Sequence, residues 1–351
     1  MRLRRLEAGS RAVLVGLARR LPQPLPLELG ADKPPVRVLY LRYDRIGDMI
    51  LSTGLLRALA RSHPNVVVDV LASPANAPVL AGNPHVRSIV IADSAYLGAF
   101  QRVRRERYDA ILDCQIFSPS TTTLIMMLMS RARHRIGLAG RGIDAAFTLP
   151  VARPASARHY VEHLGALASA FGVTNADWRP EIFLTAAERA LGESRWQAGR
   201  RLLINVSAGK TSRRWPADRF ATILRAVRAR DDLRDDLDVI VTAAPADRSL
   251  GEDLAGVGGR YVSTRSVREA FALVATADYV LTPDTAIAHA ASAFGKPAVV
   301  MYIRNRAEVW GPYRTGGIAI GAPEGNLQSL PVEPVRDAVM DLLLEPVSHA
   351  P

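Results

Sequence analysis

The stretch Val36–Ala60, VRVLYLRYDRIGDMILSTGLLRALA, decides how the rest of the chain is interpreted. Its first six residues are rich in valine and leucine and follow two prolines, which predicts a strand. A polar turn follows, and apolar side chains then recur at helical spacing, which predicts a helix. In an open α/β sheet, ligands bind at the loop that leaves the carboxyl end of a strand. Gly47 and Asp48, in that loop, are the first candidates for chemistry.

Length and composition set broad limits. A chain of 351 residues favours two domains, and a hydrophobic content of 48% is ample for sizeable cores. The single cysteine, Cys114, excludes an intramolecular disulfide and suits a reducing compartment. It follows an apolar run, which favours a buried structural thiol over a nucleophile.

The formal net charge of +11 predicts an acidic partner, such as nucleic acid, an anionic membrane surface or a phosphorylated substrate. Arginine supplies most of the excess, and an arginine-rich genome composition explains it equally well.

Residues 1–35 form a basic N-terminal extension. Its apolar core is too short and too broken for a signal peptide, and no run in the chain is long enough to span a bilayer. Two interpretations stay open: a basic amphipathic helix lying on an anionic leaflet, or an N-terminal helix docked on the domain. The side chains of its expected apolar face are Leu3, Leu6, Val13, Leu14 and Leu17.

Beyond the extension, strands and helices alternate twice, which predicts two parallel sheets with helices on both faces. A polar helix, Thr185–Trp196, interrupts the alternation. The segment after Tyr302 is expected to be rich in loops before a final helix near Pro334–Leu344. Neither half has a G-x-G-x-x-G in the strand–turn–helix context of a dinucleotide oxidoreductase. The expected parts are a first Rossmann-like domain at 36–172, a connection at 173–200, a second Rossmann-like domain at 201–330, and a C-terminal helix and tail at 331–351.

In the second half, the loop SAGKTSRRWP follows the strand that ends at Val206. Small residues permit close backbone approach, hydroxyls donate hydrogen bonds, and basic side chains supply positive charge. This combination suits a pyrophosphate at a helix N-terminus. A solvated basic turn is the alternative. The candidates here are Ser207, Gly209, Lys210 and Arg213.

A second strand-to-helix loop reads LTPDTAIAH. Asp284 or Thr285 can cap the helix that begins there, and we expect Asp284 to organise the loop. Thr285 and neighbouring N–H groups would then meet a phosphate. His289, one helical turn after Thr285, is either a ligand contact or a buried core histidine.

Together, RYDRIGDMILSTGLLRAL, NVSAGKTSRRWPADRF and ADYVLTPDTAIAHAASAFGKPAVVMY resemble glycosyltransferase family 9, typified by bacterial lipopolysaccharide heptosyltransferases. The resemblance runs from Val36 to Leu344. It implies a GT-B architecture, in which two Rossmann-like domains with parallel sheets face each other across a central cleft. It also implies that the first domain binds the acceptor and the second binds the nucleotide-sugar donor.

Carried over by position, the resemblance implies that Asp48 is the general base of an inverting transfer. Gly47, with Arg42 or Arg45, would serve the acceptor. Arg213 stands where the family has a lysine that contacts the donor phosphate, and Ala286 replaces the glycine of its D-T-G-x-x-H element. Residues 284, 285 and 289 match that element, and Asp247 lies where an acid near the donor nucleoside is common.

The family needs no metal and no cofactor, and ADP-heptose is its typical co-substrate. The acidic run around Asp231 and Asp238 precedes a strand, which favours a solvated turn over a metal site. We expect a glycolipid or phosphorylated saccharide acceptor, peripheral contact with the anionic inner face of the cytoplasmic membrane, a cytoplasmic location and no nucleic acid. The rivals are another GT-B nucleotide-sugar enzyme, such as an epimerase, and a non-catalytic basic binding protein.

Overall fold

The computed structural model describes residues 2–21, 24–92, 96–197, 199–234, 236–304 and 306–344. The chain divides into two compact units, Met1–Trp178 and Arg179–Pro351. The boundary falls inside the segment 173–200 that was predicted as the connection.

Unit 1 contains a six-stranded parallel sheet with the order β3-β2-β1-β4-β5-β6. The chain therefore runs outward from β1 to one edge and then from β4 to the other, so β1 and β4 flank the topological switch point. The strands are β1 (Val36–Leu41), β2 (Val66–Ala72), β3 (Ser88–Ile91), β4 (Ala110–Asp113), β5 (His134–Leu138) and β6 (Leu149–Val151).

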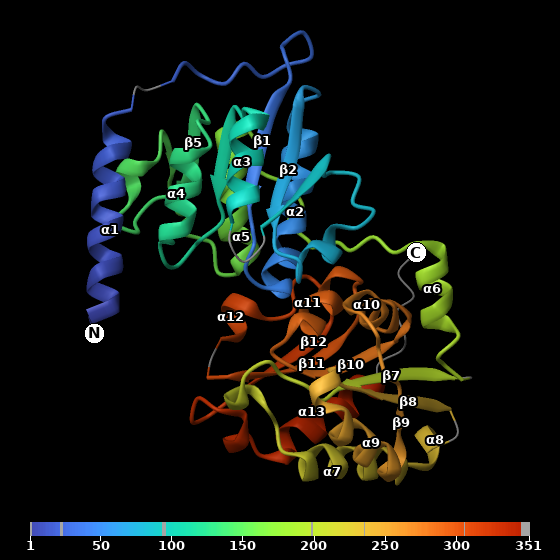
Figure 1. Cartoon of the computed structure of the whole chain (residues 1–351). Coiled ribbons are helices and arrows are strands. Elements are labelled where there is room, and N and C mark those ends of the chain that lie inside the picture. Colours follow the sequence, from blue (N-terminus) through green and yellow to red (C-terminus); the bar gives the residue numbers. More distant parts are fainter. Residues whose placement is uncertain are drawn as a thin grey trace. The chain divides into compact units, whose positions relative to one another are not determined.

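Helices cover both faces of this sheet (Figure 1). The alternation of side chains along β1 directs Leu39 and Leu41 into the core beneath α1, α3 and α4, while Tyr40 faces α2. The helices are α1 (Arg2–Arg19), α2 (Ile46–Ser62), α3 (Leu97–Glu106), α4 (Thr121–Met129) and α5 (Tyr160–Gly165), with 3-10 turns η1 (Ala77–Leu80), η2 (Asp144–Ala146) and η3 (Ala166–Phe171).

Helix α1 packs against α4 and η2, so the N-terminal helix docks on the domain (Figure 1). The docking face carries Val15 and Ala18, which are buried, whereas Val13 and Leu17 are 65% and 51% exposed. The buried face of the helix therefore differs from the predicted apolar face, because the core lies against Val15 and Ala18. Leu3 and Leu6 of that face lie outside the described side chains.

Unit 2 repeats the same strand order, β12-β11-β10-β7-β8-β9, all parallel, with the switch point between β7 and β10. The strands are β7 (Arg200–Asn205), β8 (Leu237–Thr242), β9 (Arg260–Tyr261), β10 (Tyr279–Pro283), β11 (Ala298–Ile303) and β12 (Gly317–Ala322).

One face of this sheet is covered by α7, α9 and α13, and the other by α6, α10 and α11 (Figure 1). The helices are α6 (Ala186–Glu193), α7 (Ala217–Arg228), α8 (Asp231–Arg234), α9 (Arg248–Gly258), α10 (Val267–Thr276), α11 (Ala286–Ala293), α12 (Ala307–Trp310) and α13 (Val332–Leu344), with 3-10 turns η4 (Thr211–Arg213), η5 (Pro245–Asp247) and η6 (Leu327–Ser329).

The expected loop-rich segment after Tyr302 contains a strand, β12, which the sequence pattern did not predict. Its sequence, GIAIGA, is short and bounded by glycine, and its side chains are largely exposed. Pairing with β11 from Ala298 to Ile303 supplies the order that local sequence does not. Among the described residues, no helix is long and apolar enough to cross a bilayer.

Candidate active site

The loop after β1 is built around a buried arginine. Arg42 is 1% exposed, and its guanidinium donates to Asp44 at 3.0 Å, to the carbonyl of Cys114 at 2.9 Å and to the Tyr160 hydroxyl at 2.8 Å. These partners tie the β1 loop to the end of β4 and to α5. The predicted buried thiol at Cys114 is confirmed.

Two carboxylates in this loop have opposite electrostatic environments. Burial raises the pKa of Asp48 above the ordinary aspartate value, and Asp44 adds to the rise against the charges of Arg42 and Arg45. Burial also acts on Asp44, but the adjacent Arg42 outweighs it and lowers the pKa of Asp44. Carboxylates whose pKa values are pushed apart in this way are typical of sites that perform acid–base chemistry.

Asp48 lies in the first turn of α2 and is 4% exposed. Its Oδ2 accepts a hydrogen bond from Arg45 Nε at 2.8 Å. Its Oδ1 accepts none from the described residues, which leaves one oxygen able to take a proton from a ligand. Gly47 precedes it in the same turn without using the left-handed backbone that glycine allows.

An aromatic side chain that sequence reasoning missed lies beside Tyr160, which binds Arg42. Phe117, in the loop after β4, is 52% exposed. Its ring centroid is 6.0 Å from that of Tyr160 and 6.2 Å from that of His163. The sequence feature that could have identified it is an aromatic residue in a loop that follows a strand at the switch point.

In unit 2, the end of β7 meets the end of β10 through a buried amide, which sequence reasoning also missed. Asn205 Nδ2 donates to Thr282 Oγ1 at 2.9 Å, to the carbonyl of Ser207 at 3.2 Å and to Thr285 Oγ1 at 3.3 Å. Asparagine therefore fixes the two loops that sequence motifs had singled out separately. The sequence feature that could have identified Asn205 is a polar residue at the end of an otherwise apolar strand.

Arg213 is held against the loop after β10. Its Nη1 donates to the carbonyl of Asp284 at 3.1 Å and lies 3.3 Å from that residue's carboxylate. Its Nε is buried and has no partner among the described residues. Asp284 and Arg213 therefore hold each other in place across the two loops.

A third loop joins the same edge of the sheet. Asp247, in η5 after β8, is buried and forms an ion pair with Arg214 at 2.9 Å. The Ser207 hydroxyl accepts a hydrogen bond from the N–H of Ala244 at 2.7 Å. The loops after β7, β8 and β10 are thus linked by side chains that the sequence placed only individually.

The start of α11 offers free donors. The Thr285 hydroxyl accepts from the N–H of Ile287 at 3.3 Å and so caps the helix. Within the described residues, the N–H groups of Thr285 and Ala286 make no hydrogen bond. His289, one turn further, is 5% exposed, and its ring centroid is 6.5 Å from that of Trp310.

The family model described as glycosyltransferase family 9 (heptosyltransferase) matches residues 97–333, well over half of the chain. The chain belongs to glycosyltransferase family 9. It is a glycosyltransferase, and the predicted family membership is confirmed.

Known relatives agree with this assignment. Lipopolysaccharide heptosyltransferase 2 of Salmonella typhimurium is 24% identical over 302 residues, covering 76% of this chain and 82% of the relative. A glycosyl transferase family 9 structure from Veillonella parvula has a TM-score of 0.76 at 17% identity and covers 90% of this chain and 99% of that one. Escherichia coli heptosyltransferase WaaC with ADP gives 0.69 at 16% identity, with 87% and 99% covered. The GT-B fold class is confirmed.

Acidic residues near the amino end of β8 in this glycosyltransferase form ion pairs with arginines. Asp232 pairs with Arg230 and Asp238 with Arg260. Among the residues the structure describes, no group of three or more His, Cys, Asp or Glu side chains gathers to hold a metal.

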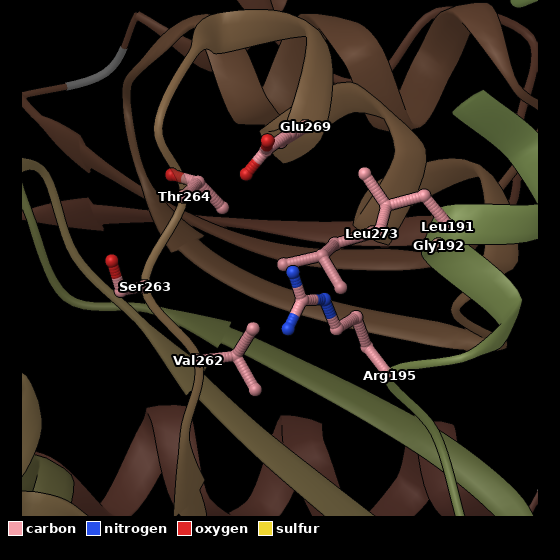
Figure 2. A pocket seen from close by; sticks show the side chains of 8 residues that line it. All are labelled: Leu191, Gly192, Arg195, Val262, Ser263, Thr264, Glu269 and Leu273. Carbon is pink, nitrogen blue, oxygen red and sulfur yellow. The ribbon is translucent and has the colours of Figure 1, made fainter. Parts of the chain in front are cut away.

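A cavity in unit 2 of the glycosyltransferase lies between α6 and α10, close to the end of β9 (Figure 2). Its volume is about 10 Å³, room for one water molecule at most. Figure 2 shows Leu273, Val262 and the Arg195 side chain around it. This cavity cannot hold a nucleotide sugar, so the donor candidates remain at the loops after β7, β8 and β10.

Gly209 and Lys210 are both exposed in the β7 loop of the glycosyltransferase. A Cβ added at Gly209 would meet nothing within 4 Å. We therefore expect Gly209→Ala to leave the melting temperature unchanged and to raise the donor KM about three- to tenfold, by blocking one backbone hydrogen bond to phosphate. Donor titration of initial rates measures the effect.

The matched control for that variant is Gly256→Ala in α9, where an added Cβ also meets nothing within 4 Å. It should not change the donor KM. An unchanged donor KM in Gly209→Ala would remove the β7 loop backbone from the donor site.

Proposed function

We propose that this glycosyltransferase moves a heptose from an ADP-heptose-type donor to a lipopolysaccharide-type acceptor, by a single displacement without a metal. The acceptor hydroxyl oxygen attacks the anomeric carbon, and the bond from that carbon to the diphosphate oxygen breaks. Asp48 takes the hydroxyl proton as the nucleoside diphosphate leaves, and the anomeric centre inverts.

One observation carries this proposal: Asp48 is a buried carboxylate with a raised pKa and one unbonded oxygen, at the switch point of the unit-1 sheet. A base whose pKa is raised toward the working pH accepts a proton more readily in the transition state. Gly47 and Arg45 would contact the acceptor. Arg42, being buried, would act by positioning the loop.

On the donor side, the diphosphate would be met by Lys210, Arg213 and the free N–H groups of Thr285 and Ala286. Ser207, Gly209 and Asp284 would shape the loops that hold it. Asp247 and His289 would lie toward the nucleoside and the sugar. The choice of ADP-heptose is supported by the relatives, which include heptosyltransferase WaaC with ADP.

The acceptor is proposed from the relatives' names, such as lipopolysaccharide heptosyltransferase 2 of Salmonella typhimurium. A glycolipid of this kind would place the protein in the cytoplasm, in peripheral contact with the anionic inner face of the membrane. The formal charge of +11 suits such a surface and a phosphorylated acceptor.

Thermal shift with ADP-, GDP- and UDP-sugars tests the donor. The proposal expects stabilisation by ADP-heptose above the others, followed by transfer to a lipopolysaccharide core acceptor with inversion seen by NMR. Donor conversion without any acceptor would instead indicate an epimerase, and binding without turnover would contradict the transferase mechanism.

The ion pair with Arg45 predicts a pH effect. Arg45 favours the charged form of Asp48, so Arg45→Gln should raise the Asp48 pKa further. The acid limb of the kcat–pH profile should then move to higher pH. On that limb the rate should fall roughly two- to fivefold, since the arginine is exposed and screened.

Arg61→Gln, an exposed charge loss in the last turn of the same helix, is the control and should leave the pH profile in place. A profile for Arg45→Gln that moves to lower pH, or does not move, would contradict the assignment of Asp48 as the titrating base.

A further inference from the structure

A large cavity lies at the end of the unit-1 sheet opposite Asp48. Its volume is about 790 Å³, and its walls come from the segment before β1 and from the start of β5. Strand β1 runs from the cavity to the β1 loop and is six residues long, so the two are roughly 20 Å apart. It is therefore separate from the candidate active site.

One wall of this cavity is cationic. Arg131, Arg133 and Arg135 line it together with His134. None of these arginines forms an ion pair with a described residue. Glu28 and Asp109 also line the cavity, so three guanidinium groups face two carboxylates.

Two of the basic side chains are buried with few hydrogen-bond partners. Arg135 is 4% exposed, and its one hydrogen bond runs from Nε to the carbonyl of Ala146 at 2.8 Å. Burial lowers its pKa. His134 is 3% exposed, burial lowers its pKa, and it forms a hydrogen bond with the backbone of Leu25, while its Nδ1 has no partner among the described residues. An anion would give the Arg135 guanidinium the charged partner that it lacks.

A second part of the lining, the apolar wall, carries no charge. It includes Leu21, Leu25, Leu128 and several prolines. Leu25 is 86% exposed and Leu21 41% exposed, although both line the cavity. Leaving leucine side chains in water is costly at about 25 cal/mol per Å², so a hydrocarbon ligand would stabilise this wall.

Apolar surface continues from the cavity onto the N-terminal helix. Val13 and Leu17 are four residues apart on α1 and are largely exposed, and Leu21 follows at the same spacing. Arg19 and Arg20 are exposed beside them. Exposed apolar side chains flanked by arginines are typical of a surface that lies in a membrane interface.

We propose that this cavity binds one anionic membrane phospholipid, with its phosphate against Arg131, Arg133 and Arg135 and an acyl chain against Leu25 and Leu128. The volume is within the range of ligand pockets in proteins. The inference rests on the membrane contact proposed above and gives that contact a site and a ligand class. It makes no use of the transfer reaction.

The cationic wall is tested with the full-length protein and phosphatidylglycerol-rich vesicles. Arg131→Glu/Arg133→Glu changes two exposed side chains and should weaken sedimentation with the vesicles at least about tenfold. Arg104→Glu/Arg105→Glu, an equal charge change at exposed positions of α3, is the control and should weaken it much less. Equal losses in the two double variants would overturn the proposal in favour of general surface charge.

The apolar wall is tested with a fluorescent side chain at the cavity. Leu25→Trp should be quenched by phosphatidylglycerol with brominated acyl chains, whereas Leu97→Trp, at an exposed position of α3, should not. Absence of quenching at position 25 would overturn the proposal, as would equal quenching by brominated phosphatidylcholine.

A competition experiment distinguishes a phospholipid headgroup from a free anion as the ligand of the cavity. Inorganic phosphate or myristate should not displace the vesicles from the protein, and displacement by phosphate alone would reassign the site to a free anion. Transfer to a soluble, delipidated core acceptor is measured in parallel. Wild-type protein that performs transfer but does not bind the vesicles would overturn this inference only, and wild-type protein that binds the vesicles without transfer would overturn only the proposed function.

Discussion

Asp48→Asn is expected to lower kcat by about 10²–10⁴, the usual contribution of a general base, while leaving donor binding intact. The amide keeps the size of the carboxylate and cannot take the acceptor proton. Steady-state transfer rates and donor binding by calorimetry measure the two parts separately. Retained turnover would remove Asp48 from the chemistry.

The same substitution carries a stability signature. The pKa of Asp48 is raised in the fold, so its ionisation costs folding free energy as the pH rises above the unfolded pKa, and the full cost is present above the folded pKa. Asp48→Asn should therefore melt no lower than the wild type at neutral pH, and any gain should shrink as the pH falls below the folded pKa and vanish below the unfolded pKa.

Asp44→Asn is the matched control, four residues upstream. The pKa of Asp44 is lowered, so its charge stabilises the fold above the unfolded pKa, and that stability is lost as the pH falls. Neutralising it leaves the buried Arg42 without its carboxylate, at a cost of about 1–3 kcal/mol. A lower melting temperature is expected for Asp44→Asn alone, and the same drop in both variants would contradict the assigned environments.

Arg213→Gln is expected to raise the donor KM on the order of ten- to a hundredfold, the equivalent of one lost charge-assisted hydrogen bond to the diphosphate. The Arg213 guanidinium is already aimed by Asp284, so the substitution removes an oriented donor as well as a charge. Donor titrations with both ADP-heptose and ADP locate the loss at the diphosphate.

Arg213→Lys should recover part of this affinity, because lysine keeps the charge and loses the planar fork. Arg214→Gln is the control in the same loop: its side chain is half exposed and pairs with Asp247. It should affect the donor KM less. A larger effect at Arg214 would move the phosphate contact to that residue.

Local sequence predicted much of the architecture because strands and helices have different apolar periods. The six residues from Val36 that were predicted as a strand form β1, and the final helix expected near Pro334–Leu344 is α13, Val332–Leu344. β12 was missed, since an exposed edge strand of small residues has no such period and is ordered by pairing with β11.

The active-site candidates also divide into those that the sequence pattern placed and those that only tertiary contacts revealed. The strand–loop–helix pattern placed Asp48, Gly209 and Thr285 at the carboxyl ends of strands. The sequence pattern could not show that Arg42 is buried, that Arg213 is oriented by Asp284, or that Asn205 joins two loops. Each of these depends on contacts between residues far apart in the chain.

The sequence by itself therefore determined two α/β units, the loops proposed to carry the chemistry and, through its motifs, the family. Only the tertiary structure decided which charged side chains are buried, which pair and which stay open to a ligand. The physical reason is that periodicity is a local property of the chain, whereas burial and pKa depend on what packs around each group. Asp44 and Asp48 are two aspartates in one short loop, and their surroundings alone separate them.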